Sequence, residues 1–383
     1  MNTGPKLTNG NLVFGYDTGY GAADNTTVTR FYPGEPTTNL YTNSDFSNGE
    51  TGWTFGSWHN NSVTHTATTL LGPYGETVSA NKLYIGASST ATHFHQYNQS
   101  KYASGSTYTT SAWVKGSGTF QIKSHWGGNT SFTMTGDWQR VSMTVTATSS
   151  SSSNFPYFAG ESLTTGTDFY ITMCQTELKS HATPYVYSGG TTGSRSDTAS
   201  LIDLNKTTDI DVGDVSFDST GQPTFDGTDD GLNTGLFSGR NPSTNPFTIE
   251  AIVKSDTTSG ARMWLDATSN GSNQRLYCAH AATGTGNPMG IQGTAWSSSG
   301  ISDTDYHYYV ITMDGSTATL YNNSVSHSTR SYSSYGIQVI NVGGRNSYRW
   351  LGKIPVFKMY DTVLTSAQIA NNFNAYKSRF DIQ

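Results

Sequence analysis

The sequence predicts an all-β protein made of two β-sandwiches, with one short α-helix near its C-terminal end. Charged residues make up only 13% of the 383-residue chain, against about 25% in an ordinary soluble domain. Ser, Thr, Asn and 41 Gly residues are abundant instead. They disfavour long helices, because their side chains compete for backbone hydrogen bonds or, for Gly, because the helix costs more entropy. Short alternating apolar runs, separated by Gly and polar clusters, recur along most of the chain, as expected of sandwiches.

The strand signals can be followed in chain order. An isolated apolar run at residues 11–17 comes first, and residues 107–115 and 138–145 then alternate between apolar and polar side chains. Residues 247–253 and 309–313 repeat this alternation later in the chain. Such a period of two is the pattern of a half-buried strand. The Gly- and Ser-rich residues 188–194, which lie between these groups, are the best linker candidate, and we place a domain boundary there.

One helix is predicted near the C-terminal end. Thr365 and Gln368 have the spacing of a capping box, in which each side chain satisfies a free amide at the helix start. Ile369, Phe373 and Tyr376 follow on a single stripe, which is typical of a helix that docks on a sheet.

Charge and hydropathy exclude several classes of function. The net charge of −6 argues against binding nucleic acid through a basic face. No apolar segment has the length of a signal peptide core or of a membrane-spanning helix, so we expect neither Sec export nor membrane insertion. Cys174 and Cys278 are too few for a disulfide framework, and we expect two buried free thiols.

Residues 38–187 carry a series of landmarks in a characteristic order. The series begins with Asn39-Leu40, Phe46 and Gly52-Trp53 and ends with Gln175-Thr176-Glu177 and Thr183-Pro184-Tyr185. This order resembles the carbohydrate-binding, galactose-binding-like jelly rolls, in particular those of phage tail and virion proteins. The resemblance implies a jelly-roll fold. The family often holds a structural calcium ion after the opening Phe, and Asp45 is the candidate ligand here, although Ser47 and residues 172–174 depart from the family pattern.

Residues 200–380 carry a second set of landmarks. It includes the run from Phe225 to Asp230, residues 342–345 and the closing residues 364–375. The set resembles the laminin-G-like, concanavalin A-like domains and implies a second sandwich. Pro355 departs from the family pattern, and because proline cannot donate a ladder hydrogen bond, it predicts a sheet edge or a bulge.

The isolated first strand fits the second resemblance. Phage domains of this type commonly open with a Leu-Val-x-x-x-Asp strand, which residues 12–17 match, and continue to a Tyr-Pro-Gly turn, here at residues 32–34. We therefore expect residues 1–36 and 189–383 to form one laminin-G-like domain, with residues 37–188 inserted as the jelly roll. Insertions of this kind are tolerated at exposed turns.

Candidate carbohydrate-binding residues lie in predicted loops. Sugar binding relies on aromatic faces and on oriented polar groups. The candidates are Trp58, His59, Trp126, Trp296, Arg345, Asn346 and Tyr348. For each loop tryptophan, packing in the core or at an interface is the other interpretation. The loop from Arg345 to Arg349 is equally suited to contact a neighbouring subunit.

Asp226, Asp229 and Asp230 form a tight acidic cluster. Two interpretations are open: a turn whose carboxylates accept backbone amides, or, with Asp45 as a further candidate elsewhere, calcium ligation. We expect no other cofactor.

No catalytic motif is evident. Glu250 lacks a second glutamate at the spacing of a retaining carboxylate pair, and no nucleophile elbow, zinc-binding helix or phosphate loop occurs. We expect a protein without enzymatic activity.

The two resemblances together imply a non-enzymatic structural protein of a phage virion. It would be a fibre or tail adhesin, or a capsid decoration protein, that displays glycan-binding-like domains for host attachment. Such a protein would be assembled in the host cytoplasm and exposed on the particle. Its partners would be other virion proteins, further copies of itself and a host-surface glycan. The alternatives are a secreted bacterial protein that binds or degrades polysaccharide, and a purely structural decoration protein without a ligand.

Overall fold

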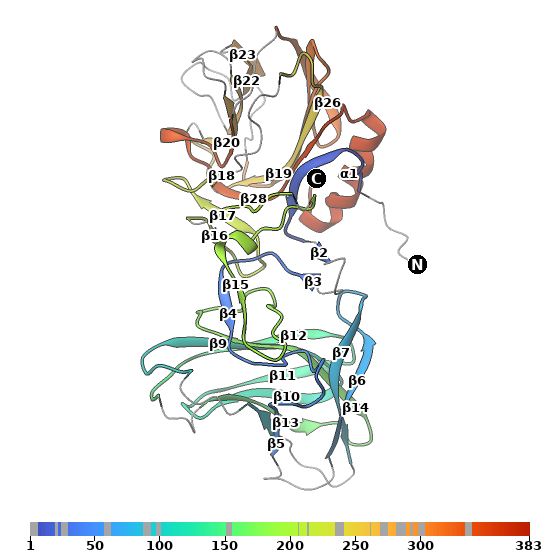
Figure 1. Cartoon of the computed structure of the whole chain (residues 1–383), viewed down its shortest axis with the longest axis vertical. Helices are drawn as coiled ribbons and strands as arrows, with labels where there is room; N and C mark the ends of the chain where they lie inside the picture. Colours follow the sequence, from blue (N-terminus) through green and yellow to red (C-terminus); the bar gives the residue numbers. More distant parts are fainter. Residues whose placement is uncertain are drawn as a thin grey trace. The chain divides into compact units, whose positions relative to one another are not determined.

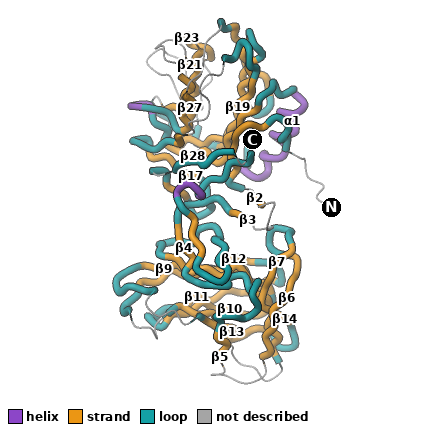
Figure 2. Tube along the Cα trace, in the orientation of Figure 1, coloured by secondary structure: helices purple, strands orange, loops and turns teal. Residues whose placement is uncertain are grey.

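A computed structural model describes most of the chain, and the chain forms two compact units. The described residues are 7–19, 22–23, 30–56, 63–86, 93–96, 101–150, 155–205, 207–212, 214–233, 241–260, 262–268, 275–280, 289–291, 294–297, 303–333 and 339–383. Unit 1 comprises Met1–Ala23, Pro33–Glu35 and Asp197–Gln383, and unit 2 comprises Asp24–Tyr32 and Pro36–Ser196. Strands dominate both units (Figure 2), so the predicted all-β class is confirmed.

Unit 1 contains two sheets with an apolar core. The larger sheet has the order β16-β17-β28-β19-β24-β25-β26, with β1 beside β28, and the smaller has the order β18-β27-β20-β21-β22-β23. The strands of the larger sheet are β1 (Leu12–Asp17), β16 (Ser216–Phe217), β17 (Pro223–Asp226), β19 (Phe247–Ser255), β24 (Tyr306–Met313), β25 (Thr317–Asn322), β26 (Val325–Ser331) and β28 (Leu351–Tyr360). Those of the smaller are β18 (Leu232–Asn233), β20 (Arg262–Thr268), β21 (Arg275–His280), β22 (Met289–Ile291), β23 (Thr294–Ser297) and β27 (Val339–Val342).

The alternation seen in the sequence decides which side chains fill this core. Phe247 and Ile249 of β19, with Tyr309 and Ile311 of β24, point into the same apolar cluster as Trp264 of the smaller sheet. The intervening residues of both strands face the other side of the larger sheet.

Pro355 lies at a bulge in the middle of β28. The pairing of β28 with β19 shifts register between Ile252 and Lys254, next to the proline. On its other side, β28 pairs with β1 as far as Val356 and with β17 only from Lys353. Pro355 therefore falls where neither neighbour needs its missing N–H, and the predicted bulge is confirmed.

Helix α1 (Ser366–Phe380) covers the other face of the larger sheet (Figure 1). Thr365 accepts a hydrogen bond from the Gln368 amide, and the reciprocal bond is also present, so the predicted capping box is confirmed. Ile369 and Tyr376 of the helix are fully buried with Tyr308 and Val356 of the sheet.

Unit 2 is built from two five-stranded sheets around a second core. Their orders are β11-β10-β13-β8-β5 and β12-β9-β14-β7-β6. The strands are β5 (Thr54–Gly56), β6 (Val63–Leu71), β7 (Thr77–Ile85), β8 (His93–His95), β9 (Thr107–Lys115), β10 (Ser117–Ser124), β11 (Asn129–Thr135), β12 (Gln139–Thr146), β13 (Pro156–Leu163) and β14 (Asp168–Glu177). The short strands β4 (Thr37–Asn39) and β15 (Gly193–Arg195) pair with each other. The remaining short elements are β2 (Ala22–Ala23), β3 (Arg30–Phe31), η1 (Asp197–Ala199) and η2 (Asn346–Tyr348).

The Gln-x-Glu and Thr-Pro-Tyr landmarks of unit 2 bond to each other. The fully buried Glu177 carboxylate accepts hydrogen bonds from the Thr183 amide (2.8 Å) and hydroxyl (2.6 Å) and from the Thr37 hydroxyl (2.9 Å). Gln175 accepts the Val186 amide (2.7 Å). The two motifs thus fasten the end of β14 to the segments that enter and leave the unit, which explains their joint occurrence.

Cys174 and Cys278 are both buried free thiols, as expected. None of the helices in the described part of the chain has the length and apolar composition of a membrane-spanning segment.

Candidate functional site

The acidic cluster lies in the turn that follows β17 in unit 1. Carboxylate oxygens of Asp226, Asp229 and Asp230 all lie within 4.8 Å of one another. Asp226 and Asp229 are exposed, whereas Asp230 is buried. Gly227 permits the turn because its φ of 79° lies in the region that only glycine adopts readily.

Backbone amides already bind two of these carboxylates. Asp226 Oδ1 accepts the Thr228 amide (2.7 Å), which lowers the pKa of Asp226. Asp230 Oδ2 accepts the Asp226 amide (2.6 Å). Burial, followed by repulsion from Asp226 and Asp229, raises the pKa of Asp230. The oxygen donors suit calcium, but the amide bonds show that the cluster also serves as a turn cap.

Two arginines connect this turn to the loop after β27. Arg262 Nη1 donates to the Gly227 carbonyl (2.7 Å) and, at 3.4 Å, to the Arg349 carbonyl. Arg349 Nη1 donates to the carbonyls of Asp230 (3.1 Å) and Gly344 (3.2 Å). The sequence placed Arg349 in the polar loop that begins at Arg345 but did not indicate its contacts, and it did not indicate Arg262 at all, because single residues that bond to distant carbonyls leave no spacing pattern.

The loop after β27 presents Arg345 and Tyr348. At Gly344, φ is 79° and an added Cβ would lie 2.5 Å from the Met263 carbonyl oxygen, so the loop requires glycine there. Arg345 Nε lies 2.5 Å from Oδ2 of the fully buried Asp266, while the Arg345 side chain stays 39% exposed. Tyr348 packs partly buried against Met263 and Tyr277.

These residues together form one rim of unit 1. We call it the Asp226–Tyr348 rim, and its members are Asp226, Asp229, Asp230, Arg262, Arg345, Tyr348 and Arg349. The structure thus joins the acidic cluster to the Arg345 loop, which were predicted as separate candidates. Carboxylates, guanidinium groups and a tyrosine ring are the groups that bind sugar hydroxyls and the apolar faces of sugar rings.

Of the other carbohydrate-binding candidates, the structure describes the side chain of Trp126 alone. Trp126 is only 8% exposed and packs against Tyr102 (ring centroids 5.0 Å apart) and Tyr108 (6.0 Å) in unit 2. Trp126 is therefore a packing residue and not an exposed sugar-binding candidate. The reason is that the turn between β10 and β11 folds back over Tyr102 and Tyr108. Trp296 lies on β23, and Asn346 begins η2; the structure describes neither side chain. Trp58 and His59 lie outside the described residues.

Asp45 belongs to a turn of unit 2. Its Oδ1 accepts the Ser47 amide (3.1 Å) and hydroxyl (2.8 Å). Within the described ranges, the only grouping of three possible metal-ligating side chains is the one at Asp226, Asp229 and Asp230, so Asp45 belongs to no such group there.

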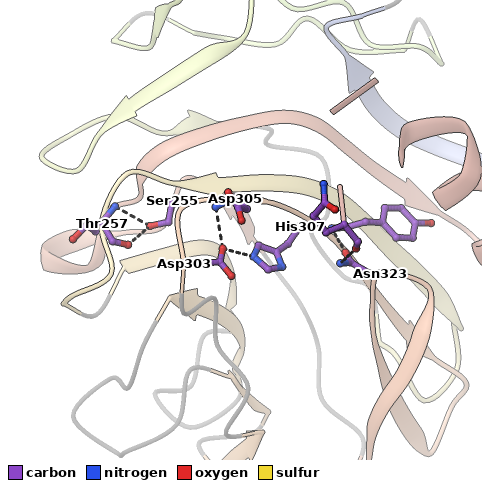
Figure 3. A network of polar contacts seen from close by, with 8 residues as sticks. Ser255, Thr257, Asp303, Asp305, His307 and Asn323 are labelled. Atoms are coloured by element: carbon purple, nitrogen blue, oxygen red, sulfur yellow. Dashed lines mark hydrogen bonds and ion pairs between the residues drawn. The ribbon is translucent and has the colours of Figure 1, made fainter. Parts of the chain in front are cut away.

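A second polar network of unit 1 surrounds the start of β24 (Figure 3). His307 Nε2 lies 2.8 Å from Asp303 Oδ1, which also accepts the Asp305 amide (2.9 Å). The His307 ring stacks on Tyr309, with centroids 5.9 Å apart, and Nδ1 is enclosed. Because one nitrogen is bound to a carboxylate and the other is enclosed, the imidazole is held as a structural group.

A concanavalin A-like lectin/glucanase superfamily model matches residues 226–370, which include the whole rim. No curated protein matches the chain. Among solved structures, similar folds include domain 4 of an extracellular arabinanase from Geobacillus stearothermophilus in complex with arabinotriose, at 14% identity and TM-score 0.34, covering 42% of this chain and 82% of that one. The botulinum neurotoxin serotype D binding domain is similar at 13% identity and TM-score 0.33, over 47% of this chain and 49% of that one. The active domain of tailspike protein 4 from bacteriophage CBA120 follows at 11% identity and TM-score 0.29, over 36% and 21%. The chain thus spans about half of the neurotoxin domain and less of the tailspike.

Proposed function

We propose that the protein is a non-enzymatic, glycan-binding structural protein of a phage virion. It acts as a fibre or tail adhesin or as a capsid decoration protein, and it contacts host-surface glycans through the Asp226–Tyr348 rim. The observation that carries the proposal is the convergence of acidic, guanidinium and aromatic side chains at one rim of a sandwich that matches the lectin/glucanase superfamily.

The rim has the chemistry for a polar sugar ligand. The exposed carboxylates of Asp226 and Asp229 can accept hydrogen bonds from sugar hydroxyls, and the Arg345 side chain is partly exposed on the same rim. Because Arg262 and Arg349 hold the turn and the loop by backbone carbonyls, these groups are ordered before a ligand arrives. Preorganisation of this kind lowers the entropy cost of binding.

The position of Glu250 supports binding rather than hydrolysis. Its side chain is fully buried and accepts hydrogen bonds from Tyr360 (2.9 Å) and from Asn372 of α1 (2.8 Å). A glycosidase carboxylate must reach the scissile bond, whereas this one lies under a helix.

The virion assignment rests on the ordered landmarks of both sandwiches and on the low charge of the chain. Many copies on one particle would convert weak single contacts into useful avidity. Assembly in the host cytoplasm with exposure on the particle is part of the same proposal, as are other virion proteins as partners.

A glycan array probed with the protein in multimerised form tests the binding claim, with intact host cells as a second target. We expect saturable binding that free sugar competes away. A multimer that binds neither the array nor cells would eliminate the adhesin and leave the purely structural decoration protein. Antibody labelling of purified particles in the electron microscope tests the virion assignment separately, and unlabelled particles would contradict it.

A further inference from the structure

We propose that the edge strand β6 of unit 2 binds a second copy of this chain, with the two β6 strands pairing antiparallel about a twofold axis at Ala67. The proposal concerns how copies assemble and does not depend on glycan binding.

Strand β6 is a long sheet edge without the usual protection. It ends the order β12-β9-β14-β7-β6, has nine residues and is mostly exposed. It contains neither Pro nor Gly, and His65 is its one ionisable residue. Leu71, at its end, is 66% exposed. Natural edge strands are normally short, charged, bulged or interrupted by proline, because a regular free edge is a template for another strand.

The ladder between β6 and β7 determines which backbone groups face outward. It runs without a register shift from the pair of Val63 and Ile85 to the pair of Leu71 and Thr77. One step beyond Leu71, the Gly72 amide bonds across to Glu76 (2.7 Å). At the other end, the N–H and C=O of Ile85 both bond to residues 166 and 167, on the side away from β6.

Antiparallel pairs alternate between hydrogen-bonded and non-bonded. Both ends of the ladder therefore assign the odd-numbered residues of β6 to the non-bonded pairs, so Val63, His65, Ala67, Thr69 and Leu71 direct their N–H and C=O groups away from β7. Among these outward groups, the structure records one partner within the described residues, the indole of Trp138 on the Leu71 carbonyl (2.9 Å). The central groups at His65, Ala67 and Thr69 form a row of donors and acceptors.

This row is complementary to itself. When the twofold axis passes through Ala67, the central residue of β6, the two antiparallel strands overlap along their whole length. In this register, outward-facing residues of one copy lie opposite outward-facing residues of the other. Ala67 then opposes its own copy, His65 opposes Thr69, and Val63 opposes Leu71. The even-numbered residues pair as Thr66 with Thr68 and Thr64 with Leu70. Val63 meets Leu71 and Thr66 meets Thr68, no like charges are opposed, and the smallest side chain lies on the axis. Such cross-strand pairs are the favourable ones.

The contact is isologous, because the same strand is used by both copies. It therefore closes as a dimer rather than growing into a filament. Pairing the two strands would join the two five-stranded sheets into one continuous sheet.

Introducing a charge at residue 67, on the axis, tests the proposal. The variants Ala67→Lys and Ala67→Glu each place like charges opposite each other on the axis, at a residue whose amide is not used by β7. Thr329→Lys, on the exposed edge strand β26 of unit 1, is the matched control for adding a charge to a strand edge. Analytical ultracentrifugation over a concentration series measures self-association, and thermal unfolding checks that each variant is folded.

We expect the wild type and Thr329→Lys to dimerise reversibly. The dimer affinity of each Ala67 variant should be at least about tenfold lower. An equal mixture of Ala67→Lys and Ala67→Glu should restore the dimer, because the opposed charges then attract. A wild type that stays monomeric up to its solubility limit would overturn the proposal. So would an Ala67→Lys variant that associates as the wild type does, since association would then use another surface.

Discussion

Glu250 of β19 and Lys358 of β28 lie directly opposite each other across neighbouring strands, and both side chains are fully buried under helix α1. Burial raises the pKa of Glu250, and the Lys358 charge acts against this rise. Asn372 of α1 donates to the same carboxylate, and Lys358 Nζ lies 5.4 Å from the ring centroid of Tyr376 of α1, so both side chains help to determine where the helix docks.

Removing one member of this pair should destabilise unit 1 strongly. We expect Lys358→Met to cost about 3–5 kcal/mol, because it leaves the Glu250 carboxylate buried without its cation. The double variant Glu250→Leu with Lys358→Met should recover most of that loss, since no charge then remains buried. Denaturant unfolding of the wild type, the single variant and the double variant measures both effects. A double variant no more stable than the single one would show that the pairing is not the source of the loss.

Acid should weaken unit 2 through His95. Its ring stacks on Phe155, with centroids 4.6 Å apart. Burial, followed by the nearby His125 and His93, lowers the pKa of His95 from 6.5 to about 4. The folded state therefore binds this proton less readily than the unfolded chain. The contribution of the neutral ring to stability is complete above pH 6.5 and is lost as the pH falls towards about 4.

As the pH is lowered from 6.5 to about 4, the melting temperature should fall less steeply in His95→Gln than in the wild type. His327→Gln, on exposed β26, serves as the control and should retain the wild-type slope. Identical slopes for all three proteins would rule out His95 as the acid-sensitive group.

The order of the segments along the chain suggests that unit 2 is nested within unit 1. Phe14 and Tyr16 of β1 belong to the core of unit 1. We expect residues 37–188 to fold alone, and residues 1–36 joined to 189–383 by a short flexible linker to fold as a second independent protein. Residues 189–383 without the N-terminal segment should be markedly less stable, because the core then lacks two aromatic side chains. Circular dichroism melts of the three proteins test this, and equal stability with and without residues 1–36 would refute it.

The two interpretations of the acidic cluster predict different responses to calcium. We expect the capping role to dominate, because Asp226 and Asp230 already accept backbone amides. Asp229→Asn should then leave stability within about 0.5 kcal/mol of the wild type, and calcium should not change the melting temperature of either protein. A calcium-dependent rise that is present in the wild type and lost in Asp229→Asn would establish calcium ligation instead.

Local signals predicted the parts of the fold that depend on neighbouring residues. The capping box at Thr365 and the bulge at Pro355 are short-range properties of the backbone, and the alternating strand at 247–253 reports directly which side chains are buried. Long-range contacts were not predictable in this way. Trp126 was correctly placed in a loop, but the sequence does not show that this loop folds over Tyr102 and Tyr108.

The candidate site likewise combines local features that the sequence indicates with long-range contacts that it does not. The acidic run and the Arg345 loop were visible in the sequence as separate polar segments, and the strand register that brings them together was not. Arg262 and Arg349 act through backbone carbonyls, which any residue can supply, so no residue type at the other end of the bond indicates them.

Glycan binding at the Asp226–Tyr348 rim is tested most directly by one comparison on a glycan array, between the multimerised wild type, Tyr348→Ala and Tyr84→Ala. Tyr84 is a 43% exposed tyrosine of unit 2 and serves as the matched control, and thermal unfolding confirms that each variant is folded. We predict that the wild type and Tyr84→Ala bind the same glycans, and that Tyr348→Ala loses roughly tenfold or more in apparent affinity. Glycan binding that survives Tyr348→Ala unchanged, or a multimerised wild type that binds no glycan, would contradict the proposed site.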